Sequence, residues 1–162
     1  MRQGDFEHIY RCYFSQVYRY ALSLTRDEAR SEELTQETFF KALQAIDRFR
    51  GESSVKTWLC AIARNCWLDE RRKRPGEPLD ELPEQPDESA GPEEQAIRRD
   101  DALRLHRALH QLPEPYKEVF SLRVFAQLSF REIGELFGKT ENWACVIYHR
   151  ARARLNQKED TQ

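Results

Sequence analysis

The residues best suited to contact nucleic acid lie near the C-terminus, on a segment whose spacing predicts a helix. Projected at ~100° per residue, the outward side of this helix carries Asn142, Val146 and His149, and arginines occupy every second position of Arg150–Arg154. An amide near the start of a helix and arginines beyond it suit contact with DNA bases first and with phosphates later. The pattern therefore predicts a helix that reads DNA.

A second helix and a tight turn are needed to position that face. Within the run Leu128–Leu155, Gly138 marks the turn, and the small Gly134 suits a helix that a second helix crosses closely. Ala144 and Ile147 follow at offsets that give the second helix an apolar inner face. These offsets match a helix-turn-helix, whose second helix enters the DNA major groove. An ordinary amphipathic helical hairpin, which gives a partial match, is the alternative.

The composition sets the class of protein. The chain has 162 residues, of which 40% are hydrophobic and 33% charged, enough for one ordinary domain or two small ones. No apolar run approaches the ~20 residues of a membrane span and the N-terminus lacks a signal-peptide pattern, so we expect a cytoplasmic protein without membrane insertion. The sequence shows no phosphate-binding glycine loop, catalytic triad or metal-ligand cluster. We therefore expect no enzyme, no cofactor and no metal site.

The four cysteines raise a metal or redox alternative. His8 and Cys12 share a helix face at i,i+4 spacing, as do Cys145 and His149. Neither pair is joined by the second pair of ligands that a structural zinc site requires. Buried free thiols are therefore the interpretation that we prefer over a metal site or a redox sensor.

Charge divides the chain into two lobes and a connector. The net charge of −2 hides +3 over residues 1–75, −8 over residues 76–94 and +3 over residues 95–162. The connector contains four of the seven prolines and no aromatic residue, so it cannot bury enough apolar area to offset its ordering entropy. We expect domains at 1–75 and 94–156, an extended or disordered linker at 76–93 and a tail at 157–162. The linker is either a plain tether or an acidic segment that occupies a nucleic-acid-like channel in a partner.

Three helices are expected in the N-terminal lobe. Apolar residues at three- and four-residue steps from Phe6 to Leu22, Tyr10 among them, predict the first, and a second should run from about Asp27 to about Asp47. The inward side of the second helix is expected to carry Leu34, Phe39, Ala42, Leu43 and Ile46. Its outer face is unusually acidic, which suits either the helix dipole or a docking patch for a partner helix.

The third helix combines basic and aromatic side chains. Gly51 breaks the chain, Ser53 or Ser54 can cap the helix, and Pro75 stops it. Basic side chains interleaved with Trp58 and an amide suit melted DNA, where bases stack and phosphates are neutralised. A basic C-terminus that merely complements the helix dipole is the alternative.

In this order the segments resemble the extracytoplasmic-function (ECF) sigma factors of bacterial RNA polymerase. The resemblance rests on DEARSEELTQETFFKAL, FRGESSVKTWLCAIARN, the acidic linker, LPEPYKEVFSLRVF and LSFREIGELFGKT, and it extends from about Phe6 to Leu155. It implies an all-α protein with two helical domains, region 2 and region 4, which bind core RNA polymerase and recognise the −10 and −35 elements of promoter DNA. It also implies an anti-sigma factor as partner, and a linker that threads toward the polymerase channels.

The resemblance also assigns roles to residues of the first domain. The surface that grips the polymerase clamp helices would consist of Glu32, Glu33, Gln36, Glu37 and Phe40. The loop that captures a flipped base of the −10 element would consist of Phe49, Arg50, Gly51, Glu52 and Ser53. The adjoining helix would hold the opened strand through Lys56, Trp58, Arg64, Asn65, Arg71 and Arg72.

In the second domain, one departure from the family pattern affects DNA reading. The −35 contacts implied by the resemblance involve Arg131, Thr140, Glu141, Asn142, Trp143, Cys145, Val146, His149 and Arg150. Family members often place an arginine or lysine and a polar residue where this chain has Cys145-Val146-Ile147. A polymerase-binding adaptor that does not read promoters is therefore one alternative. A stand-alone helix-turn-helix repressor is another, although it leaves the first domain unexplained.

Overall fold

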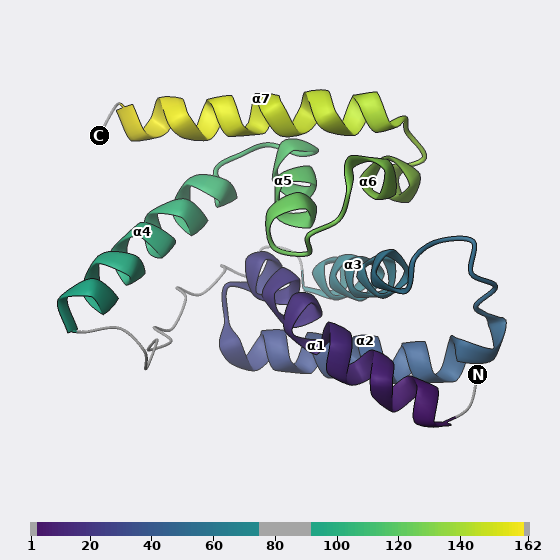
Figure 1. Cartoon of the computed structure of the whole chain (residues 1–162). Coiled ribbons are helices and arrows are strands. Elements are labelled where there is room, and N and C mark those ends of the chain that lie inside the picture. Colours follow the sequence, from purple (N-terminus) through teal and green to yellow (C-terminus); the bar gives the residue numbers. More distant parts are fainter. Residues whose placement is uncertain (1–2, 75–91, 161–162) are drawn as a thin grey trace.

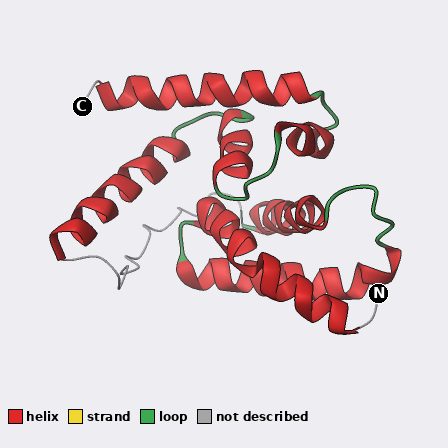
Figure 2. Cartoon of the chain, in the orientation of Figure 1, coloured by secondary structure: helices red, strands yellow, loops and turns green. Residues whose placement is uncertain are grey.

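The computed structural model describes residues 3–74 and 92–160, and these residues form helices joined by loops, as predicted (Figures 1 and 2). The N-terminal lobe contains α1 (Gln3–Thr25), α2 (Glu28–Ala45), the single 3₁₀ turn η1 (Ile46–Arg48) and α3 (Val55–Lys73). The C-terminal lobe contains α4 (Pro92–His110), α5 (Tyr116–Val124), α6 (Phe130–Phe137) and α7 (Glu141–Asp160). The predicted linker lies outside the described residues except for its last two, which begin α4.

Helix α1 packs across α2 and α3 through a narrower stripe than the sequence predicted. Ile9, Val17 and Ala21 are buried as expected, but Tyr10 is 40% exposed. Tyr20, which the pattern did not include, is fully buried. Aromatic residues occur on several sides of α1, so their spacing alone could not show which of them face the core.

Helix α2 begins and ends close to the predicted positions. Asp27 caps it by accepting a hydrogen bond from the backbone N–H of Arg30, and η1 replaces its last predicted turn. The prediction that Leu43 points inward was wrong, because its side chain is 46% exposed. Buried Thr35 and Thr38 take part of the inner face instead, where each hydroxyl donates to the carbonyl four residues earlier. Burying these hydroxyls is therefore not penalised by a lost hydrogen bond.

In the C-terminal lobe, α5 and α6 lie between α7 and the N-terminal lobe (Figure 1). A small apolar cluster joins α4, α5 and α7, and consists of Leu109, Leu112, Phe120, Ala151 and Leu155. The outermost helix of the lobe, α7, buries Ala144 and Ile147 in the larger cluster, which fixes the side that it presents outward.

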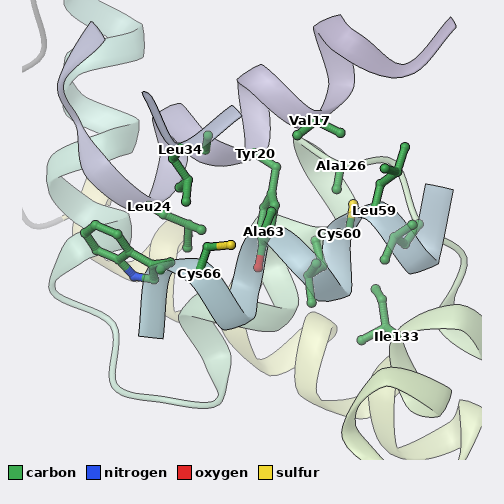
Figure 3. Close-up of a cluster of buried hydrophobic side chains, with 14 of the residues drawn as sticks. Val17, Tyr20, Leu24, Leu34, Leu59, Cys60, Ala63, Cys66, Ala126 and Ile133 are labelled. Atoms are coloured by element: carbon green, nitrogen blue, oxygen red, sulfur yellow. The ribbon is translucent and has the colours of Figure 1, made fainter. Parts of the chain in front are cut away.

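The two lobes share that larger core. Leu59, Cys60 and Ala63 of α3 are fully buried, and Ala126 and Ile133 of the C-terminal lobe lie in the same cluster (Figure 3). The sequence predicted two lobes but gave no sign that they pack together. Among the described residues, no helix combines the length and apolar character needed to cross a membrane.

Candidate functional site

The α6–α7 hairpin is built by local caps at each helix end. Ser129 accepts from the backbone N–H of Glu132 at 3.1 Å, and the Glu132 carboxylate accepts from the N–H of Ser129 at 2.7 Å. This reciprocal pair is a capping box. Gly138 ends α6 in the left-handed conformation, with φ 65°. Thr140 then caps α7 by accepting from the backbone N–H of Trp143 at 3.1 Å.

A second segment packs closely against Gly134, as predicted, but this segment is the turn before α7 rather than α7 itself. A Cβ atom at this position would lie 2.7 Å from the carbonyl oxygen of Thr140 and 2.9 Å from that of Lys139. Real Cβ atoms essentially never approach other atoms this closely. Gly134 therefore allows the turn to fold back against α6.

The outward face of α7 carries most of the residues predicted to contact the −35 element. The exposed members of this set are Arg131, Thr140, Glu141, Asn142, Val146, His149 and Arg150. Trp143 is half-buried, with its ring centroid 5.4 Å from that of Phe137, and Cys145 is also half-buried. Arg131 lies on α6, where it pairs with Glu135 at 3.4 Å. Thr140 and Trp143 thus contribute to the hairpin itself as well as to its surface.

The outer face of α2 presents an exposed aromatic residue among carboxylates. Phe40 is 60% exposed, and the neighbouring positions predicted to bind polymerase are also exposed: Glu32, Glu33, Gln36 and Glu37. Leu43, which the sequence placed inside, enlarges the apolar part of this surface. An apolar centre with an acidic rim suits a partner helix that is itself amphipathic and basic or amide-rich.

The loop before α3 and the first turns of α3 form a second surface. The rings of Phe49 and Trp58 have centroids 4.7 Å apart. Between them, Gly51 adopts φ 73°, and Arg50 and Glu52 are exposed. Ser53 is half-buried, whereas Asn65, Arg71 and Arg72 are exposed along α3.

Two of the residues predicted to hold the opened strand are engaged by the C-terminal lobe. The Arg64 guanidinium donates to both carboxylate oxygens of Glu118, at 2.9 and 3.2 Å. The Lys56 ammonium donates to the backbone carbonyl of Gln127 at 2.7 Å. Ser54, the N-cap of α3, donates to the Glu132 carboxylate at 2.8 Å. The sequence did not predict the contacts made by Ser54, Glu118, Gln127 and Glu132 between the lobes, because local patterns such as helix caps do not show which distant segments meet.

Comparison with known proteins identifies both lobes. Residues 9–75 match the family model of sigma-70 region 2, and residues 102–155 match that of sigma-70 region 4. The sigma factor SigM of Bacillus subtilis, described as an ECF RNA polymerase sigma factor, is 33% identical over 154 residues, which cover 92% of this chain and 91% of SigM. The sigma factor YlaC of the same organism is 30% identical over 159 residues, covering 96% of this chain and 92% of YlaC. This chain is an ECF sigma factor.

The fold agrees with a solved structure of this class. The sigma factor RpoE of Bartonella quintana, solved in complex with the anti-sigma factor NepR, superimposes with a TM-score of 0.78. The superposition covers 94% of this chain and 95% of RpoE, at 24% sequence identity. The likeness supports the arrangement of the helices.

As an ECF sigma factor, the protein binds core RNA polymerase and promoter DNA and directs transcription initiation, and it is not an enzyme. The stand-alone repressor is set aside because region 2 is present as well as region 4. The alternative of a polymerase-binding adaptor that does not read promoters is set aside, because the relatives that match nearly the whole chain are sigma factors.

Two of the four cysteines of the sigma factor are buried, which is fewer than the sequence suggested. Cys60 and Cys66 lie in the core, whereas Cys12 is exposed and Cys145 is half-buried. Burial raises the pKa of the Cys60 thiol to about 12, and it also raises the pKa of Cys66. Both core thiols are therefore protonated at neutral pH and poorly nucleophilic.

Within residues 3–74 and 92–160, no three His, Cys, Asp or Glu side chains are grouped closely enough to hold a metal ion.

Proposed function

We propose that this sigma factor binds its partners through three separate surfaces. The outer face of α2 binds core RNA polymerase, the loop at 49–53 together with α3 binds the opened −10 strand, and the outward face of α7 binds the −35 element. The matches to region 2 and region 4, at 9–75 and 102–155, support domains at 1–75 and 94–156 with a linker at 76–93. We further propose that the protein is cytoplasmic and that an anti-sigma factor regulates it.

The observation that carries the polymerase assignment is the exposure of Phe40. At 60% exposed, it is the most exposed large hydrophobic residue among those described. Leu43, 46% exposed, lies one helical turn from it on α2, and Tyr10 is the other exposed large hydrophobic residue of region 2 among those described. Large aromatic residues surrounded by polar groups are the usual anchors of protein interfaces.

Phe40→Ala is expected to weaken binding to bacterial core RNA polymerase by roughly 30-fold, the loss typical of a truncated interface anchor. The thermal unfolding temperature should stay unchanged, because the side chain makes little contribution to the core. Fluorescence anisotropy with a labelled sigma factor measures the affinity, and calorimetry measures the unfolding.

Val124→Ala is the matched control, because Val124 is an exposed hydrophobic residue that belongs to α5 rather than to α2. It should leave polymerase affinity at the wild-type value. Equal affinities for the wild type and the Phe40→Ala variant would contradict the assignment of α2.

The −35 assignment rests on the exposed face of α7 and on the basic side chains that follow it. Helix α7 presents Asn142, Val146 and His149 outward, with Arg150 one position beyond. Cys145 lies at the edge of this face and cannot form the bidentate contact that arginine makes with guanine. Base preference therefore depends more on the residues around Cys145, on helix-dipole contacts to phosphate and on DNA shape.

Cys145→Arg is expected to change the preferred −35 sequence by introducing a preference for guanine of roughly 5- to 150-fold at one position, the range given by one bidentate contact. Selection from a promoter library with core polymerase, followed by sequencing, measures the preference. Cys12→Arg adds the same charge at an exposed position of α1 and should leave the preference unchanged. An unaltered −35 preference in the Cys145→Arg variant would place this residue outside the readout.

A further inference from the structure

Phe130 and Tyr148 form an aromatic corner around His149. The imidazole is exposed on the outward face of α7, yet its ring centroid lies 5.4 Å from that of Tyr148 and 6.2 Å from that of Phe130. Phe130 is the first residue of α6, which packs against α7 near the start of that helix (Figure 1). Aromatic rings attract each other at centroid separations of about 4.5 to 7 Å, so both contacts favour one orientation of the imidazole.

Both rings of the aromatic corner are themselves held in place. The guanidinium carbon of Arg123 lies 4.3 Å from the ring centroid of Phe130, and the same guanidinium donates to the Leu128 carbonyl at 3.0 Å. Tyr148 stacks on the buried Phe120, with ring centroids 5.8 Å apart and an angle of 15° between the ring planes. The aromatic corner is therefore fixed by α5 and by the core of region 4.

A side chain that is ordered before binding has an advantage in reading DNA. An exposed histidine without neighbouring rings would lose rotamer freedom on contact with a base. Ordering one such side chain at an interface weakens binding by roughly 2- to 12-fold, and this loss falls only on the base that the side chain contacts. The aromatic corner removes part of this loss for His149, because it restricts the imidazole in the free protein.

We propose that Phe130 is a positioning residue for promoter reading: it holds the His149 imidazole in the orientation that contacts a base of the −35 element. The inference rests on the proposed role of α7 in −35 binding. A histidine ring has at least one N–H donor in either protonation state. In the major groove, every purine presents its N7 atom as an acceptor. His149 therefore favours a purine at one −35 position, and Phe130 strengthens that preference through His149.

A general role in supporting the α6–α7 hairpin is the alternative for Phe130, because its ring also lies 5.5 Å from that of Tyr148. Loss of hairpin support would weaken binding to every −35 sequence equally. Loss of positioning would instead reduce discrimination at the one base pair that His149 contacts. Base preference, measured position by position, therefore distinguishes the two roles.

Phe130→Leu tests the positioning role in the full-length sigma factor bound to core polymerase. Selection from a promoter library, followed by sequencing, measures the base preference at each −35 position. His149→Ala identifies the position that His149 contacts, as the one where the purine preference falls. We expect Phe130→Leu to reduce the preference at that same position by roughly 2- to 12-fold and to leave the other positions unchanged.

Two further substitutions at Phe130 show that the ring itself is required. Phe130→Tyr keeps the aromatic ring and should keep the wild-type preference. Phe130→Met replaces the ring with a flexible apolar side chain that fills irregular space, so it should behave like Phe130→Leu if the leucine variant folds poorly. Full wild-type preference in a folded variant without the ring would overturn the proposal.

Combining Phe130→Leu with His149→Ala separates positioning from an independent contact. If Phe130 acts through His149, the double variant should show the same preference as His149→Ala alone, because no imidazole remains to be positioned. Independent effects would multiply instead, and that result would overturn the proposal. An equal loss at all −35 positions in Phe130→Leu would indicate general support of the hairpin and would overturn it as well.

Phe125→Leu is the matched control, because it removes another phenylalanine–histidine pair of region 4. Phe125 stacks on His106 with ring centroids 5.3 Å apart, and His106 is buried on α4 rather than exposed on α7. This variant should keep the wild-type −35 preference at every position.

Asn142→Ala separates failure of the positioning role from failure of the proposed DNA surface. Asn142 is exposed on the same face of α7, about two turns before His149. If Asn142→Ala changes the −35 preference while either His149→Ala or Phe130→Leu does not, the positioning role is wrong but the α7 surface stands. If neither Asn142→Ala nor His149→Ala alters any −35 position, the α7 assignment is wrong and the positioning role falls with it.

Discussion

Gly134→Ala is expected to disrupt the α6–α7 hairpin and to abolish −35 DNA binding. The added methyl group would lie 2.7 Å from the Thr140 carbonyl oxygen, 2.8 Å from the Thr140 carbonyl carbon and 2.9 Å from the Lys139 carbonyl oxygen. All three are backbone atoms of the turn, so no flexible side chain can move aside. At an unobstructed helical position, replacing glycine by alanine would raise the free energy of unfolding by about 1 kcal/mol. Overpacking against the turn lowers it by about 3 kcal/mol, so the net effect is destabilising.

Thermal unfolding and −35 DNA binding measure this effect together. For a chain of this size, the net loss of about 2 kcal/mol lowers the unfolding temperature by roughly 4 to 8 °C. Gly4→Ala is the matched control, because a Cβ at Gly4 meets nothing within 4 Å. Gly138→Ala should fall between the two, since its φ of 65° strains an alanine although nothing obstructs the methyl group. Equal unfolding temperatures for the Gly134→Ala and Gly4→Ala variants would show that the turn relaxes at no cost.

The same hairpin shows what the sequence could predict. Gly134 and Gly138, together with the apolar contacts of Ala144 and Ile147, all lie within a few turns of one another, so their spacing determines the local geometry. The buried and exposed sides of α7 follow the predicted helical projection. The start of α2 was predicted correctly for the same reason, because Asp27 is a local cap.

Packing between distant segments could not be predicted in this way. Arg64 and Glu118 are 54 positions apart, and Lys56 and Gln127 are 71 apart. Whether these side chains meet depends on how region 4 docks on α3, which no periodicity encodes. Leu43 illustrates a related limit, because an apolar residue kept exposed for a partner follows the same spacing as one buried in the core.

We expect region 4 to make the sigma factor less stable in acid through two histidines of α4. His106 is buried and stacks on Phe125, with ring centroids 5.3 Å apart, and no hydrogen-bond partner satisfies its Nδ1. Burial, reinforced by the nearby positive charge of Arg26, lowers the pKa of His106 to about 4. Burial also lowers the pKa of His110 to about 3, with further contributions from the positive charges of Arg26, Lys117 and Arg71.

Stability is therefore expected to fall as the pH is lowered from 7 toward 4. Unfolded histidine titrates near pH 6.5, so below that pH the unfolded chain binds protons that folded His106 and His110 do not. The difference is largest between pH 6.5 and pH 4, and His106 alone should lower the free energy of unfolding by about 2 kcal/mol at pH 5. Denaturant unfolding followed at pH 7, 6 and 5 measures the loss.

His106→Gln should flatten this profile, because glutamine does not titrate and the difference in proton uptake disappears at that position. The unfolding free energy of this variant should lose about 2 kcal/mol less than that of the wild type between pH 7 and pH 5. His8→Gln, at an exposed position of α1, should keep the wild-type pH dependence. The positive charge of Arg26, which follows α1, also opposes protonation of His106 on α4. An unchanged profile in His106→Gln would mean that the imidazole binds protons equally in the folded and unfolded states, so that burial does not lower its pKa.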